Sequence, residues 1–203
     1  MEMEVIVAGP GAGQSPSATS VSMFERTILP ALIAAAKPVV FDADALNAIA
    51  FNATLETALV ARRSGPTILT PHPAEAARLL HKGTPEVNDD RLGAALAIAQ
   101  RFNAHVVLKG AGSICAFPDG RWSVNTTGNA GLAAAGSGDV LAGMIGAFLA
   151  QKLEPAKALQ YAVCLHGAAA DSCVARAIGP IGLTAMDVAL EARALLNRWT
   201  SSQ

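Results

Sequence analysis

Cysteine is scarce in this sequence, and the three cysteines present, Cys115, Cys164 and Cys173, lie far apart. They form neither a CxxC pair nor a spacing typical of a metal site, so we expect reduced thiols in the core of a cytoplasmic protein. An excess of charge of one sign is also lacking, since 15 Lys and Arg balance 16 Asp and Glu. Because there is no basic cluster, we expect no nucleic-acid partner.

The chain also lacks a hydrophobic run long enough to span a bilayer, and the opening MEMEVIVAGPG lacks the basic start of a signal peptide. We therefore expect no membrane association. What the sequence does contain is 52% hydrophobic residues over 203 positions, with abundant alanine and no internal repeat. This composition and length favour a single domain in which helices pack closely on a sheet.

A glycine-dense run from residue 126 to residue 143 dominates the sequence, and its second half reads as a loop that leads into a buried helix over Asp139–Gln151. Glycines at the start of a helix let backbone N–H groups face a ligand, and the helix dipole favours an anion there. Gly136, Ser137 and Gly138 thus predict a phosphate site. The run fits neither the P-loop nor the GxGxxG pattern.

Asp139 is the unusual residue of this run, because its carboxylate lies where an anion would bind. One interpretation is a helix-terminal carboxylate that satisfies free N–H groups. The other is a general base that takes a proton from a hydroxyl while neighbouring amides hold the phosphoryl group being transferred. The sequence leaves both open at this point.

Short apolar runs predict parallel strands, and a β-meander closed at residues 118–120 follows the last of them. The strands are expected at Val5–Ala8, Val39–Phe41, Thr67–Leu69 and Ala104–Leu108, and the meander at Ile114–Phe117 and Trp122–Val124. The polar segment from His81 to Asn88 reads as a loop. Helices are expected over Ser17–Ala36 with an interruption at Pro30, over Leu55–Arg63, from Pro73, over Asp89–Phe102, from Pro155 to about Arg176, and from Thr184 to about Trp199.

Polar or glycine-rich segments follow each of the four predicted parallel strands. They contain Gly11 and Gly13, then Asp42, Asp44 and Asn47, then His72 and Glu75, and finally Lys109 with Gly110, Ala111, Gly112 and Ser113. Each has a plain structural interpretation: a tight turn, an N-cap at Asp44, a solvated histidine, a dipole-stabilised Glu75 and a β-turn. Strand ends gather along one edge of an α/β sheet, however, so these segments can also build one cleft.

Four motifs in order, FDADALN, LTPHPAE, VLKGAGS and GSGDVLAG, resemble the ADP-dependent NAD(P)H-hydrate dehydratases. These form the C-terminal domain of the bifunctional nicotinamide-nucleotide repair protein. The resemblance implies a ribokinase-like fold, an α/β three-layer sandwich with a mainly parallel sheet. It also implies a lyase that dehydrates hydrated NADH or NADPH while ADP is converted to AMP and phosphate, with Mg²⁺ accompanying the nucleotide and no dedicated metal site. Such proteins are usually homo-oligomers.

The resemblance also assigns residues. Asp139 would be the catalytic base and a substrate contact. The substrate would further meet Gly11, Gly13, Asp42, Asp44, Asn47 and His72. ADP would meet Lys109, Gly110, Ala111, Gly112, Ser113, Asn129, Gly136, Ser137 and Gly138, with the loop from residue 125 to 131 lying over it. His166 is expected to be a packed core histidine.

The chain departs from the resemblance in one main respect, because the family carries further strands and a glycine-rich segment before GPGxG. We therefore expect one domain over residues 1–203 that lacks the family's N-terminal portion. Leu132 and Ala135 stand where the family more often has Met and Gly, and neither change removes a chemical group. Two alternatives stay open: a kinase of the same fold that phosphorylates a vitamin precursor with ATP, and a non-catalytic nucleotide-binding remnant.

Overall fold

A computed structural model of the chain describes residues 4–13 and 22–201. In chain order the elements are β1 (Ile6–Ala8), η1 (Phe24–Ile28), α1 (Leu29–Ala34), β2 (Val39–Phe41), α2 (Asp44–Phe51), α3 (Ala53–Ala61), β3 (Thr67–Leu69), α4 (Pro73–Leu80), α5 (Thr84–Asp89), α6 (Arg91–Arg101), β4 (His105–Leu108), β5 (Ile114–Ala116), β6 (Trp122–Val124), η2 (Ala130–Ala133), α7 (Ser137–Ala150), α8 (Pro155–Ala175) and α9 (Ala185–Ser201). None of the helices in these ranges combines the length and apolar character needed to cross a bilayer.

Within residues 4–13 and 22–201, six strands form one mixed sheet in the order β1-β2-β3-β4-β5-β6. Strands β1 to β4 pair in parallel, and β4-β5-β6 pair antiparallel. The expected mainly parallel sheet and the meander after its last parallel strand are thus confirmed. Strands β2 and β3 are buried along their whole length and β4 along most of it, because helices cover both faces of the sheet there, whereas Val7 in β1 is exposed.

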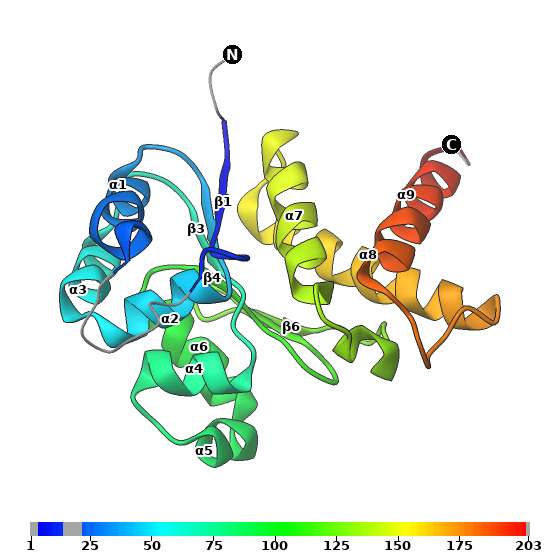
Figure 1. Ribbon diagram of the computed structural model, residues 1–203, viewed down its shortest axis with the longest axis horizontal. Coiled ribbons are helices and arrows are strands. Elements are labelled where there is room, and N and C mark those ends of the chain that lie inside the picture. The colour runs from blue at the N-terminus through cyan, green and yellow to red at the C-terminus, as the bar shows by residue number, and fades with distance from the viewer. Residues whose placement is uncertain (1–3, 14–21, 202–203) are drawn as a thin grey trace.

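The alternation of side chains along each strand divides the core into two halves. In β2, Val39 and Phe41 belong to the apolar cluster beneath α1 to α6, whereas Val40 belongs to the cluster beneath α7 to α9. In β4, Val106 and Val107 divide in the same way. Figure 1 shows these two groups of helices on opposite sides of the sheet. The expected three-layer α/β sandwich is the observed architecture.

Two expectations about local structure are corrected. The segment after His81 contains α5 rather than a loop, because Pro85 lies in its first turn and the Glu86 carboxylate accepts a hydrogen bond from Gly83 N. The helix expected over Ser17–Ala36 is a π-helical segment followed by α1, with Pro30 in the first turn of α1, where a missing N–H is tolerated. Residues 17–21 lie outside the described ranges.

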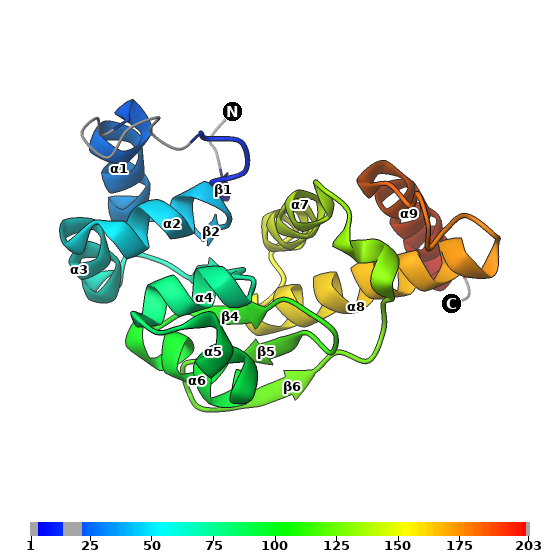
Figure 2. The same ribbon diagram turned by 60° about the horizontal axis from the view of Figure 1, so that its bottom comes forward.

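The carboxyl ends of β1 to β4 lie along one edge of the sheet, and the start of α7 lies beside them (Figure 2). The segments that follow these strands are therefore brought together although they are far apart in sequence. Gly9, after β1, illustrates how tight this edge is, since a Cβ on it would lie 1.7 Å from the Asp42 carbonyl oxygen.

Candidate active site

The start of α7 carries first-turn amides and the carboxylate of Asp139, and Asp139, unlike Ser137 and Gly138, does not line the cavity described below. Gly136 precedes the helix at φ 80, a left-handed conformation that favours glycine. Ser137 N donates to the Ala134 carbonyl at 3.3 Å, and Ser137 is buried. The amides of Gly138 and Asp139 lie in the first turn, where a helix leaves N–H groups without intrahelical partners. The Asp139 side chain is exposed, so it does not point into the core.

A cavity of about 690 Å³ opens beside this helix start. Its lining includes most of the residues expected to bind a nucleotide: Lys109, Gly110, Ala111, Gly112, Ser113, Asn129, Ser137 and Gly138. Gly136 does not line it, and its position indicates a conformational role at the helix start. Apolar side chains of Val124, Leu132, Leu141 and Val163 form another part of the wall. The volume and the mixed lining are those of a small-ligand site.

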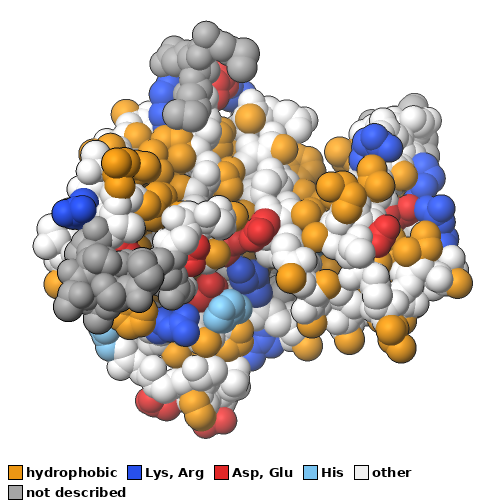
Figure 3. Space-filling view, in the orientation of Figure 1, with side chains coloured by type: hydrophobic (Ala, Val, Ile, Leu, Met, Phe, Trp, Pro, Cys, Tyr) orange, Lys and Arg blue, Asp and Glu red, His pale blue; other side chains and the backbone are white. Residues whose placement is uncertain are grey.

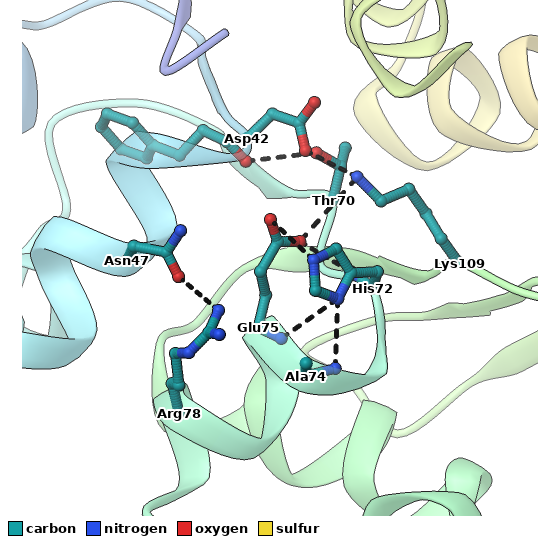
Figure 4. Close-up of polar contacts among 9 residues, drawn as sticks. Asp42, Asn47, Thr70, His72, Ala74, Glu75, Arg78 and Lys109 are labelled. Carbon is teal, nitrogen blue, oxygen red and sulfur yellow. Dashed lines mark hydrogen bonds and ion pairs between the residues drawn. The ribbon is translucent and has the colours of Figure 1, made fainter. Parts of the chain in front are cut away.

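Lys109 joins the cavity to the acidic residues after β2 and β3. Its ammonium donates to Oδ1 of Asp42 at 2.8 Å and lies 3.9 Å from Oε2 of Glu75 (Figure 4). Both carboxylates are buried, Asp42 being only 1% exposed. A Cβ placed on Gly138 would lie 3.2 Å from the Lys109 ammonium and 3.7 Å from Oδ2 of Asp42. The start of α7, Lys109 and Asp42 therefore meet at one point.

His72 caps α4, and both nitrogens of its ring are engaged within its own turn. Nδ1 accepts from Ala74 N and Glu75 N, while Nε2 lies 3.3 Å from Oε1 of Glu75 (Figure 4). Glu75 Oε2 accepts in return from His72 N at 2.8 Å, which completes a capping box. Because Nδ1 accepts, the proton of the neutral ring is on Nε2. Burial lowers the pKa of His72, Glu75 raises it in part, and Lys109 and Arg78 lower it further.

Asp44 and Asn47 lie on α2, the helix that begins shortly after β2 and Asp42. The sequence leaves open an N-cap at Asp44, but the N-cap of α2 is Ala43. Oδ2 of Asp44 instead accepts a hydrogen bond from Gly13 N at 2.9 Å. That hydrogen bond ties α2 to the glycine-rich loop after β1, in which Gly11 faces open space. Asn47 is buried, and its Oδ1 accepts from Arg78 at 2.8 Å (Figure 4). Figure 4 shows Asn47 and His72 grouped around the Asp42–Lys109 pair, and of these four residues only Lys109 lines the cavity.

His166 is the residue whose setting the sequence did not reveal. It is buried, as expected of a core histidine, but its Nε2 lies 3.2 Å from Oγ of Ser137, and both residues line the cavity. Burial lowers the pKa of His166 to about 4, so the ring is neutral at neutral pH. The two residues are 29 positions apart, and only a predicted packing of α8 against α7 would have paired them.

The cysteines lie apart from this chemistry. Cys115 and Cys173 are buried free thiols, as expected, and burial raises the pKa of Cys115 to about 12. Cys164 is exposed, so the expectation of a core thiol is wrong there, because position 164 of α8 lies outside the apolar cluster that contains its neighbours Val163 and Leu165. Among the described residues no group of three or more His, Cys, Asp or Glu side chains is arranged to hold a metal ion.

Charged side chains of both signs and a histidine gather at the centre of one face of the molecule, with hydrophobic side chains around them (Figure 3). A site of this kind combines a basic group, buried carboxylates and helix-start amides beside a cavity. It is suited to positioning a phosphorylated ligand next to a proton acceptor.

This sheet order and site define the ribokinase-like fold. A ribokinase-like superfamily protein from Enterococcus faecalis matches 94% of this chain and 63% of its own with a TM-score of 0.71, at 24% identity, which shows the fold alone. The family follows from the sequence comparison, in which the model of the NAD(P)H-hydrate dehydratases matches residues 1–191. The chain belongs to this family.

Two related proteins show how similar this chain is to known members of the family. The ADP-dependent (S)-NAD(P)H-hydrate dehydratase of Neisseria meningitidis serogroup B is 51% identical over 166 residues, which cover 82% of this chain and 55% of that protein. The ADP/ATP-dependent NAD(P)H-hydrate dehydratase of Bacillus subtilis, co-crystallised with ATP and Mg²⁺, superimposes with a TM-score of 0.81 at 32% identity, covering 98% of this chain and 66% of that chain. The chain thus spans about half the length of the Neisseria relative.

Proposed function

We propose that this chain dehydrates hydrated NADH and NADPH back to the reduced nucleotides while ADP is converted to AMP and phosphate. The observation that carries the proposal is the position of Asp139, an exposed carboxylate in the first turn of α7. It directly follows Gly138, where Lys109 and Asp42 meet beside the cavity. The names of the Neisseria and Bacillus relatives support the same reaction.

In the first step Asp139 accepts the proton of the ring hydroxyl. The hydroxyl oxygen then forms a bond to the β-phosphorus of ADP, and the bond from that phosphorus to the oxygen of AMP breaks. The first-turn amides of α7 stabilise the negative charge on the migrating phosphoryl group, and the Lys109 ammonium adds a positive charge beside Gly138. Both groups are held in place before the substrate arrives.

In the second step the phosphorylated ring loses phosphate from one carbon and a proton from the neighbouring carbon. The double bond of the dihydropyridine is thereby restored, and the products are the reduced nucleotide, phosphate and a proton. A phosphate ester leaves far more readily than hydroxide, which explains why a dehydration consumes ADP.

The substrate lies on the side of the cleft formed by Gly11, Gly13, Asp42, Asp44, Asn47 and His72. The ring nitrogens of His72 are already engaged, and its side chain is 47% exposed. His72 therefore contacts the nicotinamide through its ring face rather than through a hydrogen bond from a free nitrogen. ADP lies on the other side, in the cavity lined by residues 109–113 and 125–130.

Mg²⁺ fits beside this site because Oδ2 of Asp42 is buried and has no hydrogen-bond partner among the described residues. Magnesium in nucleotide sites commonly takes one or two carboxylates and completes its shell with phosphate oxygens and water, so a larger protein cage is unnecessary. Asp42 would hold the ion, and the ion would neutralise charge on the phosphoryl oxygens.

We also propose a homo-oligomer, since large apolar side chains such as Ile181 and Met186 are 96% and 65% exposed. Light scattering of the purified chain tests this directly, and a mass of a single chain at all concentrations would refute it.

The activity is tested by supplying the 203-residue chain with NADH hydrate and either ADP or ATP. Recovery of the absorbance of NADH with ADP, accompanied by equal amounts of AMP and phosphate, is the expected result. No recovery with either nucleotide would refute the proposal. If the chain instead phosphorylates a vitamin-precursor alcohol with ATP, the kinase alternative replaces it.

A further inference from the structure

The loop between β6 and η2 forms one wall of the nucleotide cavity, since all its residues from 125 to 129 line it. This segment has no strand or helix of its own, so its shape depends on contacts with the rest of the chain. If this loop were mobile, the affinity for the nucleotide would be lower, because binding would also have to order the loop. The groups that hold this loop therefore matter for ADP binding.

One face of α8 contacts this loop and the end of the strand before it. Gln160 donates to Ser123 Oγ at 2.9 Å, and the Cys164 carbonyl accepts from Thr127 Oγ1 at 3.0 Å. A Cβ on Gly167 would lie 2.2 Å from Thr127 Oγ1, so the loop rests directly on the helix there. Positions 160, 164, 167 and 171 lie on one face of a helix, four, three and four residues apart.

Asp171 completes this face and uses both of its carboxylate oxygens on the loop. Oδ2 accepts from Gly128 N at 2.8 Å, and Oδ1 accepts from the Asn129 amide nitrogen at 2.9 Å. The other end of the Asn129 side chain, Oδ1, accepts from Gly131 N at 3.0 Å. Both ends of the Asn129 side chain are thus engaged within the protein, although the residue itself lines the cavity.

We propose that Asp171 is a positioning residue for the nucleotide, which acts through Gly128 and Asn129 without lining the cavity itself. It holds the loop in the shape that receives ADP, and Asn129 contributes mainly as the partner of Asp171. The inference rests on the proposed function for the identity of the nucleotide. Asp139 lies on a different helix, so loss of Asp171 should weaken ADP binding and leave the chemical step intact.

The test compares Asp171→Asn with Glu154→Gln. Glu154 begins the same helix and also accepts two hydrogen bonds, from Ala156 N at 3.1 Å and Lys157 N at 3.0 Å, but it does not line the cavity or contact the loop. In Asp171→Asn we expect the Kd for ADP, measured by calorimetry, to rise about tenfold, as expected for loss of one charge-assisted hydrogen bond. The control should keep the wild-type Kd.

Kinetics separate positioning from a general structural defect. At saturating ADP, kcat and the KM for the hydrate should stay within about twofold of wild type in Asp171→Asn. An unchanged Kd for ADP, or equal losses in kcat and in both KM values, would overturn the inference. If Asp171→Asn fails to fold, Asn129→Ala should show the same selective loss of ADP affinity, and an unchanged Kd in that variant has the same negative meaning.

A double-mutant cycle tests the link between the two residues. Because Asn129 acts mainly through Asp171, Asp171→Asn combined with Asn129→Ala should raise the Kd by less than the product of the two single effects. Multiplicative effects would mean that Asn129 binds ADP independently. A wild-type chain that binds ADP but regenerates no NADH would refute the proposed function, while the inference on Asp171 would still be decided by the Kd values.

Discussion

The ammonium of Lys109 lies 2.8 Å from Oδ1 of Asp42, and this pair joins two segments 67 residues apart at the start of α7. The Lys109 side chain is 20% exposed and that of Asp42 1%, so the pair is largely removed from water. A buried ion pair contributes little net stability, but breaking it leaves one charge without its partner.

We therefore predict that Lys109→Met lowers the free energy of unfolding by about 3 kcal/mol, the usual cost of removing one partner of a buried pair. Adding Asp42→Asn should recover part of this loss, because the second change removes the unpaired carboxylate. Urea denaturation of the single and double variants measures both effects. If the losses of the two single variants simply add in the double variant, the pair is not the source of the effect.

His72 has two separable roles, as helix cap and as a ring face toward the substrate. In His72→Asn the amide oxygen can still accept from the first-turn amides of α4, so stability should change little. The KM for hydrated NADH should rise about tenfold because the ring face is lost, while the Kd for ADP stays unchanged. Steady-state kinetics and calorimetry measure these values, and equal weakening of both ligands would contradict the division of the cleft.

The Glu75 carboxylate influences the pKa of His72. The pKa of His72 is lowered mainly by burial, and the Glu75 carboxylate partly offsets that decrease. In Glu75→Gln the opposing charge is gone, so the pKa of His72 should fall further below its value in the wild type. NMR titration of the His72 ring protons measures the change, and a higher pKa in the variant would show that the carboxylate does not act on this ring.

The sequence predicted the parts of this molecule that depend on local pattern. The apolar runs at Val39–Phe41 and Thr67–Leu69 are strands because a buried parallel strand needs no alternation. Gly136 does precede a buried helix, but that helix begins at Ser137, two residues earlier than expected, so Gly138 lies in its first turn. The sequence did not predict α5. Pro85 and Glu86 are residues typical of a helix start, but the polar composition of the surrounding segment indicated a loop. Such errors come from weighing local signals, and they do not affect the site.

Contacts between side chains that are far apart in the chain could not be predicted from the sequence. Nothing in the pattern places His166 against Ser137 or Asp171 against Gly128, because each depends on how α8 packs. The roles assigned by resemblance rest on matching motifs. The structure adds which of those side chains already have hydrogen-bond partners within the protein. For His72, both ring nitrogens have partners within its own turn, so the contact that we propose with the substrate is made by the ring face.

His166 gives the protein a dependence of stability on pH. Its pKa is about 4 in the folded chain and 6.5 as the ordinary value, so below pH 6.5 the unfolded chain binds a proton that the folded chain does not. Stability from this group is present above pH 6.5 and is lost as the pH falls toward 4. Between these values the wild type should lose about 3 kcal/mol more than His166→Gln, which cannot titrate. Parallel urea titrations at a series of pH values measure this, and identical pH profiles would exclude His166 as the cause.

Asp139→Asn offers the most direct measurement of the proposed mechanism, because it removes the proton acceptor and keeps the size of the side chain. Recovery of NADH absorbance from the hydrate in the presence of ADP is followed for wild type and variant, with ADP binding measured on the same samples. We predict that the variant binds ADP with the wild-type Kd and that its rate of NADH recovery falls at least about a thousandfold, in the range of a lost general base. A variant that still regenerates NADH at a rate close to that of the wild type would show that Asp139 does not accept the hydroxyl proton.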